Sequence, residues 1–236
     1  MLKYLTAALL TALAMSLPAK AVTINVGDVG ASGTTQLQGY VDVNGVAVSI
    51  PNLTGTLFLE YDGVTNGGLT WNFDYTVTNT SSNLITNARI SSFGLNTTPN
   101  ITGGTSTGLF DTVNLNPPFP NVNGANAIEM CFASTTGCSG GDGLLSGEFA
   151  SGEFTLTFSQ VLGAISLDAA YLRFQSIDGS SFGFVGASGV GFNVGDVSIT
   201  PLAVPGPMVG AGLPGLFAAG LGLIALARRR RKRAAA

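Results

Sequence analysis

Strict alternation of apolar and polar side chains is the feature that most limits how this chain can fold. From Leu69 to Thr78 the residues read Leu-Thr-Trp-Asn-Phe-Asp-Tyr-Thr-Val-Thr. A period of two places successive side chains on opposite faces of a β-strand, so this segment predicts a strand with one buried and one wet face. The pattern recurs in the segments 57–61, 154–158 and 165–171.

Shorter strand candidates, separated by Asn, Gly, Asp and Ser turns, occupy much of the central region. They are the segments 22–26, 37–43, 46–50, 88–95, 128–132, 183–185 and 197–200. The Gly-rich segment 186–191 has no basic residue and no helix pattern after it, so it predicts a turn at a strand edge rather than a phosphate loop. Many short strands of this kind favour an antiparallel sandwich. We therefore predict an all-β fold over residues 22–203, a single antiparallel β-sandwich of jelly-roll-like type.

The first 21 residues have the three parts of a secretory signal peptide. Lys3 gives a short positive region, residues 5–17 are apolar, and Ala19-Lys20-Ala21 is the small-x-small pattern that signal peptidase recognises. As a helix, the apolar stretch would cover only about 20 Å of the roughly 30 Å hydrocarbon core of a bilayer. We therefore predict a helical signal peptide that is cleaved after Ala21.

The C-terminal region repeats this polarity in reverse. A helix-breaking motif, Val204-Pro205-Gly206-Pro207, precedes an uncharged segment, 208–227. Pro214 interrupts this segment, so the membrane helix is expected at 216–227, after a less regular Gly-rich lead-in. A block of basic residues then follows, which holds its end of the chain in the cytoplasm and leaves the preceding domain outside. The block consists of Arg228, Arg229, Arg230, Arg231, Lys232 and Arg233. A permanent membrane anchor is one interpretation of this tail.

The combination of a signal peptide with a short motif, an apolar helix and an Arg cluster resembles the PEP-CTERM class of exported bacterial proteins. The resemblance implies that residues 204–236 are a sorting tail, which an exosortase, a membrane-embedded cysteine transpeptidase, cuts near the motif. Val-Pro-Gly-Pro stands here in place of the usual Pro-Glu-Pro. The core segments 87–99, 140–143 and 172–177, together with two cysteines, are similar to the cistern-type PEP-CTERM family, a resemblance that implies no activity.

The two cysteines, Cys131 and Cys138, enclose six residues. Export would place them in a compartment that permits disulfides, and no other thiol in the chain competes. We predict that they form a structural disulfide. Zinc is the alternative, but two thiolates need two further ligands, and the chain has no His and no third Cys.

Charged residues are scarce and unevenly placed. All thirteen acidic residues lie between Asp28 and Asp196, where only Arg89 and Arg173 are basic. Nucleic acid is therefore excluded as a partner, because phosphate binding needs clustered Lys and Arg. The lack of His excludes Ser-His-Asp and Cys-His nucleophiles. We expect Arg173 to pair with a carboxylate, with an anionic sugar as the alternative.

Carboxylates are the remaining candidates for catalysis or metal binding. Glu129, Asp142, Glu148 and Glu153 fall within one stretch, and paired carboxylates serve glycoside hydrolysis. Their positions beside Ser-Gly turns are more typical of solvent-facing charges at strand starts. Oxygens near Asp142 or Asp178 are candidates for Ca²⁺, although the EF-hand spacing is absent. We predict that the protein is not an enzyme and has no cofactor, with Ca²⁺ as the one metal considered.

These features together predict an exported, single-domain envelope or extracellular-matrix protein with a structural or adhesive role. The precursor would sit in the inner membrane, and the mature domain would reach the cell surface or the extracellular matrix. The expected partners are signal peptidase, an exosortase-type enzyme and extracellular polysaccharide. The alternatives are a secreted carbohydrate-binding module and, with less support, a glycoside hydrolase.

Overall fold

The computed structural model describes residues 21–43, 46–82, 85, 87–117, 128–138, 140–179 and 184–193, all within the first of two units, residues 1–201. These residues form twelve β-strands and two short 3-10 helices, η1 and η2. The elements are β1 (Val22–Asn25), β2 (Ser32–Val43), β3 (Val46–Thr65), η1 (Asn66–Gly68), β4 (Thr70–Asn79), β5 (Asn87–Thr98), β6 (Gly103–Ser106), η2 (Gly108–Phe110), β7 (Thr112–Leu115), β8 (Met130–Ala133), β9 (Leu144–Leu145), β10 (Phe149–Thr157), β11 (Ala164–Gly179) and β12 (Phe184–Asn193).

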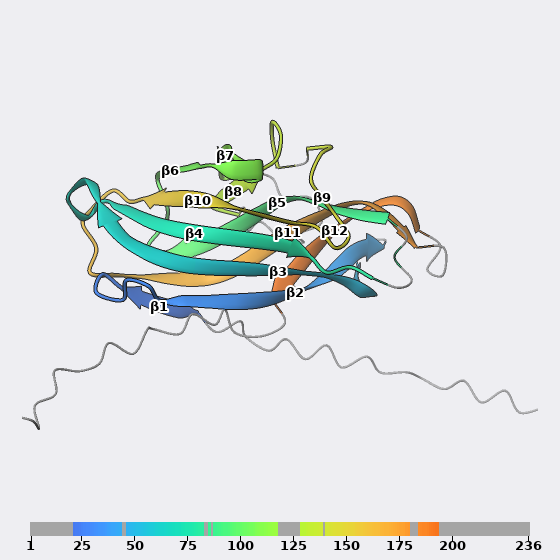
Figure 1. Cartoon of the computed structure of the whole chain (residues 1–236), viewed down its shortest axis with the longest axis horizontal. Helices are drawn as coiled ribbons and strands as arrows, with labels where there is room; N and C mark the ends of the chain where they lie inside the picture. Colours follow the sequence, from blue (N-terminus) through green and yellow to red (C-terminus); the bar gives the residue numbers. More distant parts are fainter. Residues whose placement is uncertain are drawn as a thin grey trace, which may run out of the picture. The chain divides into compact units, whose positions relative to one another are not determined.

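All twelve strands belong to one antiparallel sheet, which nearly closes into a barrel (Figure 1). Its order is β6-β10-β4-β3-β2-β12-β11-β5-β8-β7, with β1 beside β11 and β9 beside β5. The all-β, antiparallel prediction is confirmed, but one continuous sheet replaces the two facing sheets of a sandwich. Alternation produces the same buried and wet faces in both architectures, so the sequence pattern does not distinguish them.

The alternating segment at 69–78 forms β4, as predicted. Trp71, Phe73, Tyr75 and Val77 are buried, whereas the polar residues between them face outward. β4 pairs with β3 on one edge and with β10 on the other, and both neighbours carry the same alternation. Three adjacent strands therefore present one apolar face to the interior and one polar face to solvent.

Aromatic rings fill the interior beneath these strands. Phe154 of β10 lies with its ring centroid 5.0 Å from that of Phe73 and 6.2 Å from that of Tyr75, both in β4. The same ring lies 6.0 Å from Phe93 of β5 and 4.9 Å from Phe132 of β8. Strands β10 and β4 are near one end of the sheet, while β5 and β8 are near the other, so the rings connect the two ends of the sheet across the core.

A β-bulge changes the buried face of β11. The register with β5 shifts between Leu167 and Ala169, and from that point Ala170 and Leu172 are buried instead of Ala169 and Tyr171. The expectation that alternate residues from 165 to 171 share one face is therefore wrong beyond Leu167. One inserted residue moves the side chains that follow it to the opposite face, up to the next such shift in β11, between Gln175 and Asp178.

The segment 186–191 lies inside β12 and is not a turn. β12 is hydrogen-bonded between β11 and β2. A Cβ at Gly189 would lie 2.7 Å from the backbone oxygen of Tyr40, and one at Gly191 would lie 2.9 Å from a ring carbon of Phe174. Glycine is therefore required here by close contacts within the sheet rather than by a turn.

Candidate functional site

Cys131 and Cys138 form a disulfide, as predicted. Cys131 lies in β8, and Cys138 follows the turn after that strand. Their Cα atoms are 6.2 Å apart, which is within the usual range for a bridge. The bond leaves neither thiol available as a zinc ligand.

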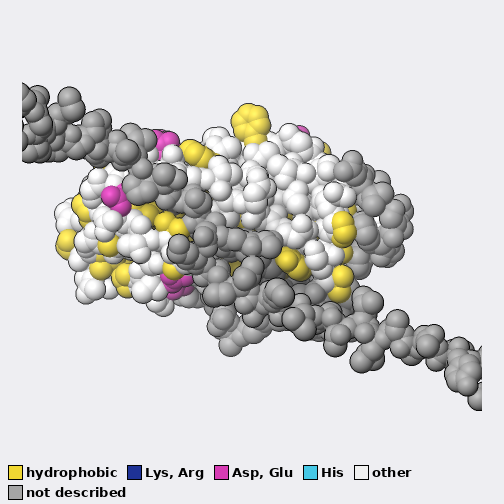
Figure 2. All heavy atoms as spheres, turned by 90° about the horizontal axis from the view of Figure 1, so that it is seen from below, with side chains coloured by type: hydrophobic (Ala, Val, Ile, Leu, Met, Phe, Trp, Pro, Cys, Tyr) yellow, Lys and Arg dark blue, Asp and Glu magenta, His cyan; other side chains and the backbone are white. Residues whose placement is uncertain are grey.

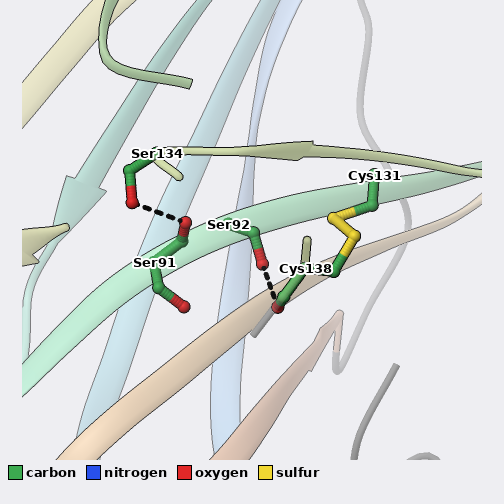
Figure 3. The surroundings of a disulfide bond; sticks show 5 residues. All are labelled: Ser91, Ser92, Cys131, Ser134 and Cys138. Carbon is green, nitrogen blue, oxygen red and sulfur yellow. Dashed lines mark hydrogen bonds between the residues drawn. A yellow bond between two sulfur atoms is a disulfide. The ribbon is translucent and has the colours of Figure 1, made fainter. Parts of the chain in front are cut away.

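Hydrogen bonds fasten the segment that carries the disulfide to β5. We call residues 131–138 and 140–143 the disulfide loop. The Ser92 hydroxyl donates to the carbonyl of Cys138 at 3.1 Å (Figure 3). The backbone N–H of Ser134 donates to the carbonyl of Ser91 at 3.0 Å. The Ser134 hydroxyl also donates to the Ser91 carbonyl, at 3.1 Å. The loop is therefore held at two adjacent residues of β5.

The disulfide belongs to a second apolar cluster, on the outer face of the sheet. Met130 and Phe132 point into the main core, so Cys131 and Ala133, which alternate with them, face the opposite way. The cluster comprises Ile128, Cys131, Ala133, Cys138 and Val190, with Tyr171 packed against it. Burial raises the pKa of the Tyr171 hydroxyl. The sequence signal for this cluster is the unbroken apolar run at 130–133, which is typical of a strand buried on both faces.

The four acidic residues that are close in sequence do not come together. The Glu129 carboxylate accepts hydrogen bonds from the backbone N–H of Thr97 at 3.0 Å and of Ile101 at 3.4 Å, so it supports the backbone. The Glu148 carboxylate accepts from the backbone N–H of Leu145 at 2.7 Å and closes a turn. Asp142 is exposed on the disulfide loop. Asp142 and Glu148 are thus solvent-facing, as their positions beside turns predict, and the carboxylates of Glu129 and Glu148 are engaged with the backbone.

Glu153 instead belongs to a row of carboxylates that crosses three strands. It lies opposite Asp74 in β4, and Asp74 lies opposite Glu60 in β3. Partial burial raises the pKa of the nearby Asp62 carboxyl, and repulsion from Asp74, Glu60 and Glu153 raises it further. This row was not predicted from the sequence, because its members are brought together by strand register alone. The signal was an acidic residue on the wet face of each alternating strand.

The carboxylate row borders an open depression on the outer face of the sheet. Its volume of about 360 Å³ is at the low end of the range for ligand pockets. Phe58, Thr76 and Ser151 also line it, and the hydroxyls of Thr76 and Ser151 are hydrogen-bonded to each other at 2.7 Å. Carboxylates and hydroxyls of this kind suit the hydroxyls of a sugar. Within the part of the chain that the structure describes, no group of three or more His, Cys, Asp or Glu is arranged to hold a metal ion, and Ca²⁺ stays a prediction.

Arg173 forms no ion pair with any residue that the structure describes, contrary to expectation. Its side chain is only 4% exposed, and its Nε and Nη1 atoms are buried without a hydrogen-bond partner. Burial lowers the pKa of the guanidinium to about 10, so the group is still charged at neutral pH. A charge in this state is costly unless something pairs with it.

The predicted export and sorting signals lie outside the described residues, apart from Ala21. These are Ala19, Val204, Pro205, Gly206, Pro207 and the basic block from Arg228 to Arg233. Ala21 is exposed, and β1 begins at the next residue, Val22. In the ranges given above, no helix is long and apolar enough to cross a membrane.

The described part of the chain is thus an antiparallel β domain with one disulfide and an acidic outer face. No protein-family model, curated protein or solved structure matches the chain. The resemblance to PEP-CTERM proteins therefore stays a prediction from the tail and the core motifs.

Proposed function

We propose that this chain is an exported bacterial protein of the cell envelope or extracellular matrix, with a structural or adhesive role. The observation that carries the proposal is the Cys131–Cys138 disulfide, because such bonds persist in oxidising compartments beyond the inner membrane. The start of β1 at Val22, directly after the proposed signal-peptidase site, also supports it. A helical signal peptide, residues 1–21, and a helical sorting segment within residues 204–236 are parts of this proposal.

The order of these segments defines the proposed steps of export and processing. Signal peptidase cuts after Ala21 while the basic block from Arg228 to Arg233 holds the C-terminus on the cytoplasmic side of the inner membrane. An exosortase-type enzyme then acts near Val204–Pro207 and releases the domain to the cell surface or the matrix. We propose no catalytic role, because Glu129 and Glu148 are engaged with the backbone.

The character of the domain surface supports an interaction with polymers other than nucleic acid. On the face drawn in Figure 2, acidic and scattered apolar side chains are visible among polar atoms, and no Lys or Arg is visible. Hydroxyl groups pair across neighbouring strands, as in Thr105 and Thr155 at 2.9 Å. A hydroxyl-rich, anionic surface of this kind repels phosphate backbones and can hydrogen-bond neutral polysaccharide.

Intact-mass analysis of the extracellular protein tests the export proposal. We expect the mature chain to begin at Val22 and to end at about Gly206, because the two cleavage signals bound this range. A variant with Arg228 to Arg231 replaced by glutamine should be mis-sorted, since it loses the positive charge that retains the tail inside. An exported wild-type protein that keeps its basic block would contradict tail removal.

The depression on β3, β4 and β10 supports a second candidate, a carbohydrate-binding module. A glycan array probed with the full chain tests it, and Asp74→Asn is expected to weaken binding of any captured glycan at least tenfold. Asp142→Asn, which removes an exposed carboxylate from the disulfide loop, is the matched control and should leave binding unchanged. If no glycan is captured, the module candidate is rejected and the structural role stands.

A further inference from the structure

The two cations of the described domain lie on the same outer face of two neighbouring strands. Arg89 of β5 is opposite Gln175 of β11, and Arg173 of β11 is opposite Ser92 of β5, with Ser91 in the bulge between these pairs. Diagonal neighbours of this kind have Cα atoms roughly 7–8 Å apart. The residues that flank the arginines point into the main core, and these are Ala88, Ile90, Leu172 and Phe174. Two positive charges are therefore neighbours in a domain that is otherwise acidic.

Both guanidiniums retain unused hydrogen-bond donors. The Nε and Nη1 atoms of Arg173 and the Nε atom of Arg89 are buried without a partner, and so is the hydroxyl of Ser91. Four of the six buried, unpartnered side-chain nitrogens and oxygens found in the described residues thus belong to three residues in one place. Buried polar groups are normally satisfied, so a cluster of unsatisfied ones indicates a missing partner.

The disulfide loop holds one edge of this cluster. Arg89 donates from Nη1 to the carbonyl of Gly141, and Ser92 donates to the carbonyl of Cys138. The carboxylate that the loop carries, Asp142, is exposed. The loop therefore supplies carbonyl acceptors at this edge, but it brings no negative charge into the cluster.

We propose that Arg89, Arg173 and Ser91 form a binding site for a small oxyanion, of the size of a carboxylate or sulfate group. The oxygens of such a group accept hydrogen bonds from the Nε–H groups of both arginines and from Nη1 of Arg173, and the Ser91 hydroxyl donates a further one. Guanidinium groups are well suited to oxyanions because their donors are planar and fixed in direction. The anion also offsets the repulsion between the two neighbouring positive charges.

This oxyanion site goes beyond the proposed function. A carboxylate can come from a uronic acid and a sulfate group from a sulfated polymer, and the chemistry recognised is the same. The site lies on β5 and β11, whereas the depression lies on β3, β4 and β10. Either site can therefore fail its test while the other passes.

Thermal melting and calorimetric titration of the full chain with glucuronate, sulfate and glucose, at constant ionic strength, test the proposal. We expect at least one of the two anions to bind and to raise the melting temperature, and glucose to do neither. Arg173→Met should weaken anion binding at least tenfold and should abolish the shift. Without anion, this variant should melt at or above the wild-type temperature, because it removes an unpaired buried charge while keeping a side chain of similar length.

Gln36→Glu is the matched control, because it lowers the net charge by one unit at an exposed position of β2 and should keep the wild-type anion response. If Arg173→Met does not fold, Arg89→Gln, at a partly exposed residue, should weaken binding at least fivefold. Binding of glucuronate alone assigns the site to carboxylates, and binding of sulfate alone assigns it to tetrahedral anions. The proposal is overturned if neither anion binds, if glucose gives the same shift, or if the arginine variants bind as the wild type does.

Discussion

Replacing Phe154 by alanine is expected to lower the free energy of unfolding by about 3–5 kcal/mol. The ring is 1% exposed and contacts four other aromatic rings, from β4, β5 and β8. Its removal would leave a cavity where these rings meet, because close-packed neighbours collapse only partly into the space. Denaturant unfolding, followed by the change in Trp71 fluorescence, measures the loss.

Phe149→Ala is the matched control for this substitution. Phe149 lies in the same strand, β10, but its side chain is 70% exposed. Removing an exposed ring leaves no cavity in the core, so we expect the free energy of unfolding to change by no more than about 0.5 kcal/mol. Equal losses for the two variants would show that the aromatic cluster does not stabilise the fold.

The second large effect is expected from Cys131→Ser combined with Cys138→Ser, which should lower the free energy of unfolding by about 2–3 kcal/mol. The bridge closes a short ring and restricts the unfolded chain, and its loss restores that freedom. The β fold should persist, because the hydrogen bonds that join the loop to β5, from Ser92 to the carbonyl of Cys138 and from Ser134 to the carbonyl of Ser91, do not involve sulfur. Circular dichroism during thermal melting measures both stability and strand content.

Thr136→Ala, at an exposed position of the same loop, is the control and should melt as the wild type does. Reduction of the wild type with a small thiol should reproduce the double variant. Free thiols in the native protein, or an unchanged melting temperature in the double variant, would contradict a structural role for the bond.

Much of the inner face of the sheet was predictable from sequence. The alternation in β4 and β10 identified Trp71, Phe73 and Phe154 as buried, because a strand in register keeps its period of two. The disulfide was also predictable, because Cys131 and Cys138 have no competing thiol and a short separation. These predictions depend on local pattern, which is set by the geometry of a single strand or turn.

The grouping of residues in the candidate sites was not predictable, because it arises from pairing between distant strands. Glu60, Asp74 and Glu153 meet only through the register of three strands. Arg89 and Arg173 become neighbours only because β5 pairs with β11 around a bulge. A bulge is set by the pairing of two strands, so it cannot be recognised from the apolar and polar pattern of either strand alone.

The strands at the two ends of the sheet, β6 and β7, limit how copies of the domain can associate at high concentration. Each is four residues long, so each offers few free backbone groups to a strand of another molecule. Edges this short discourage the strand-by-strand growth that turns β proteins into fibrils. A domain built in this way can reach a high local concentration while its copies stay individually folded, and contacts between copies then depend on side chains rather than on shared sheets.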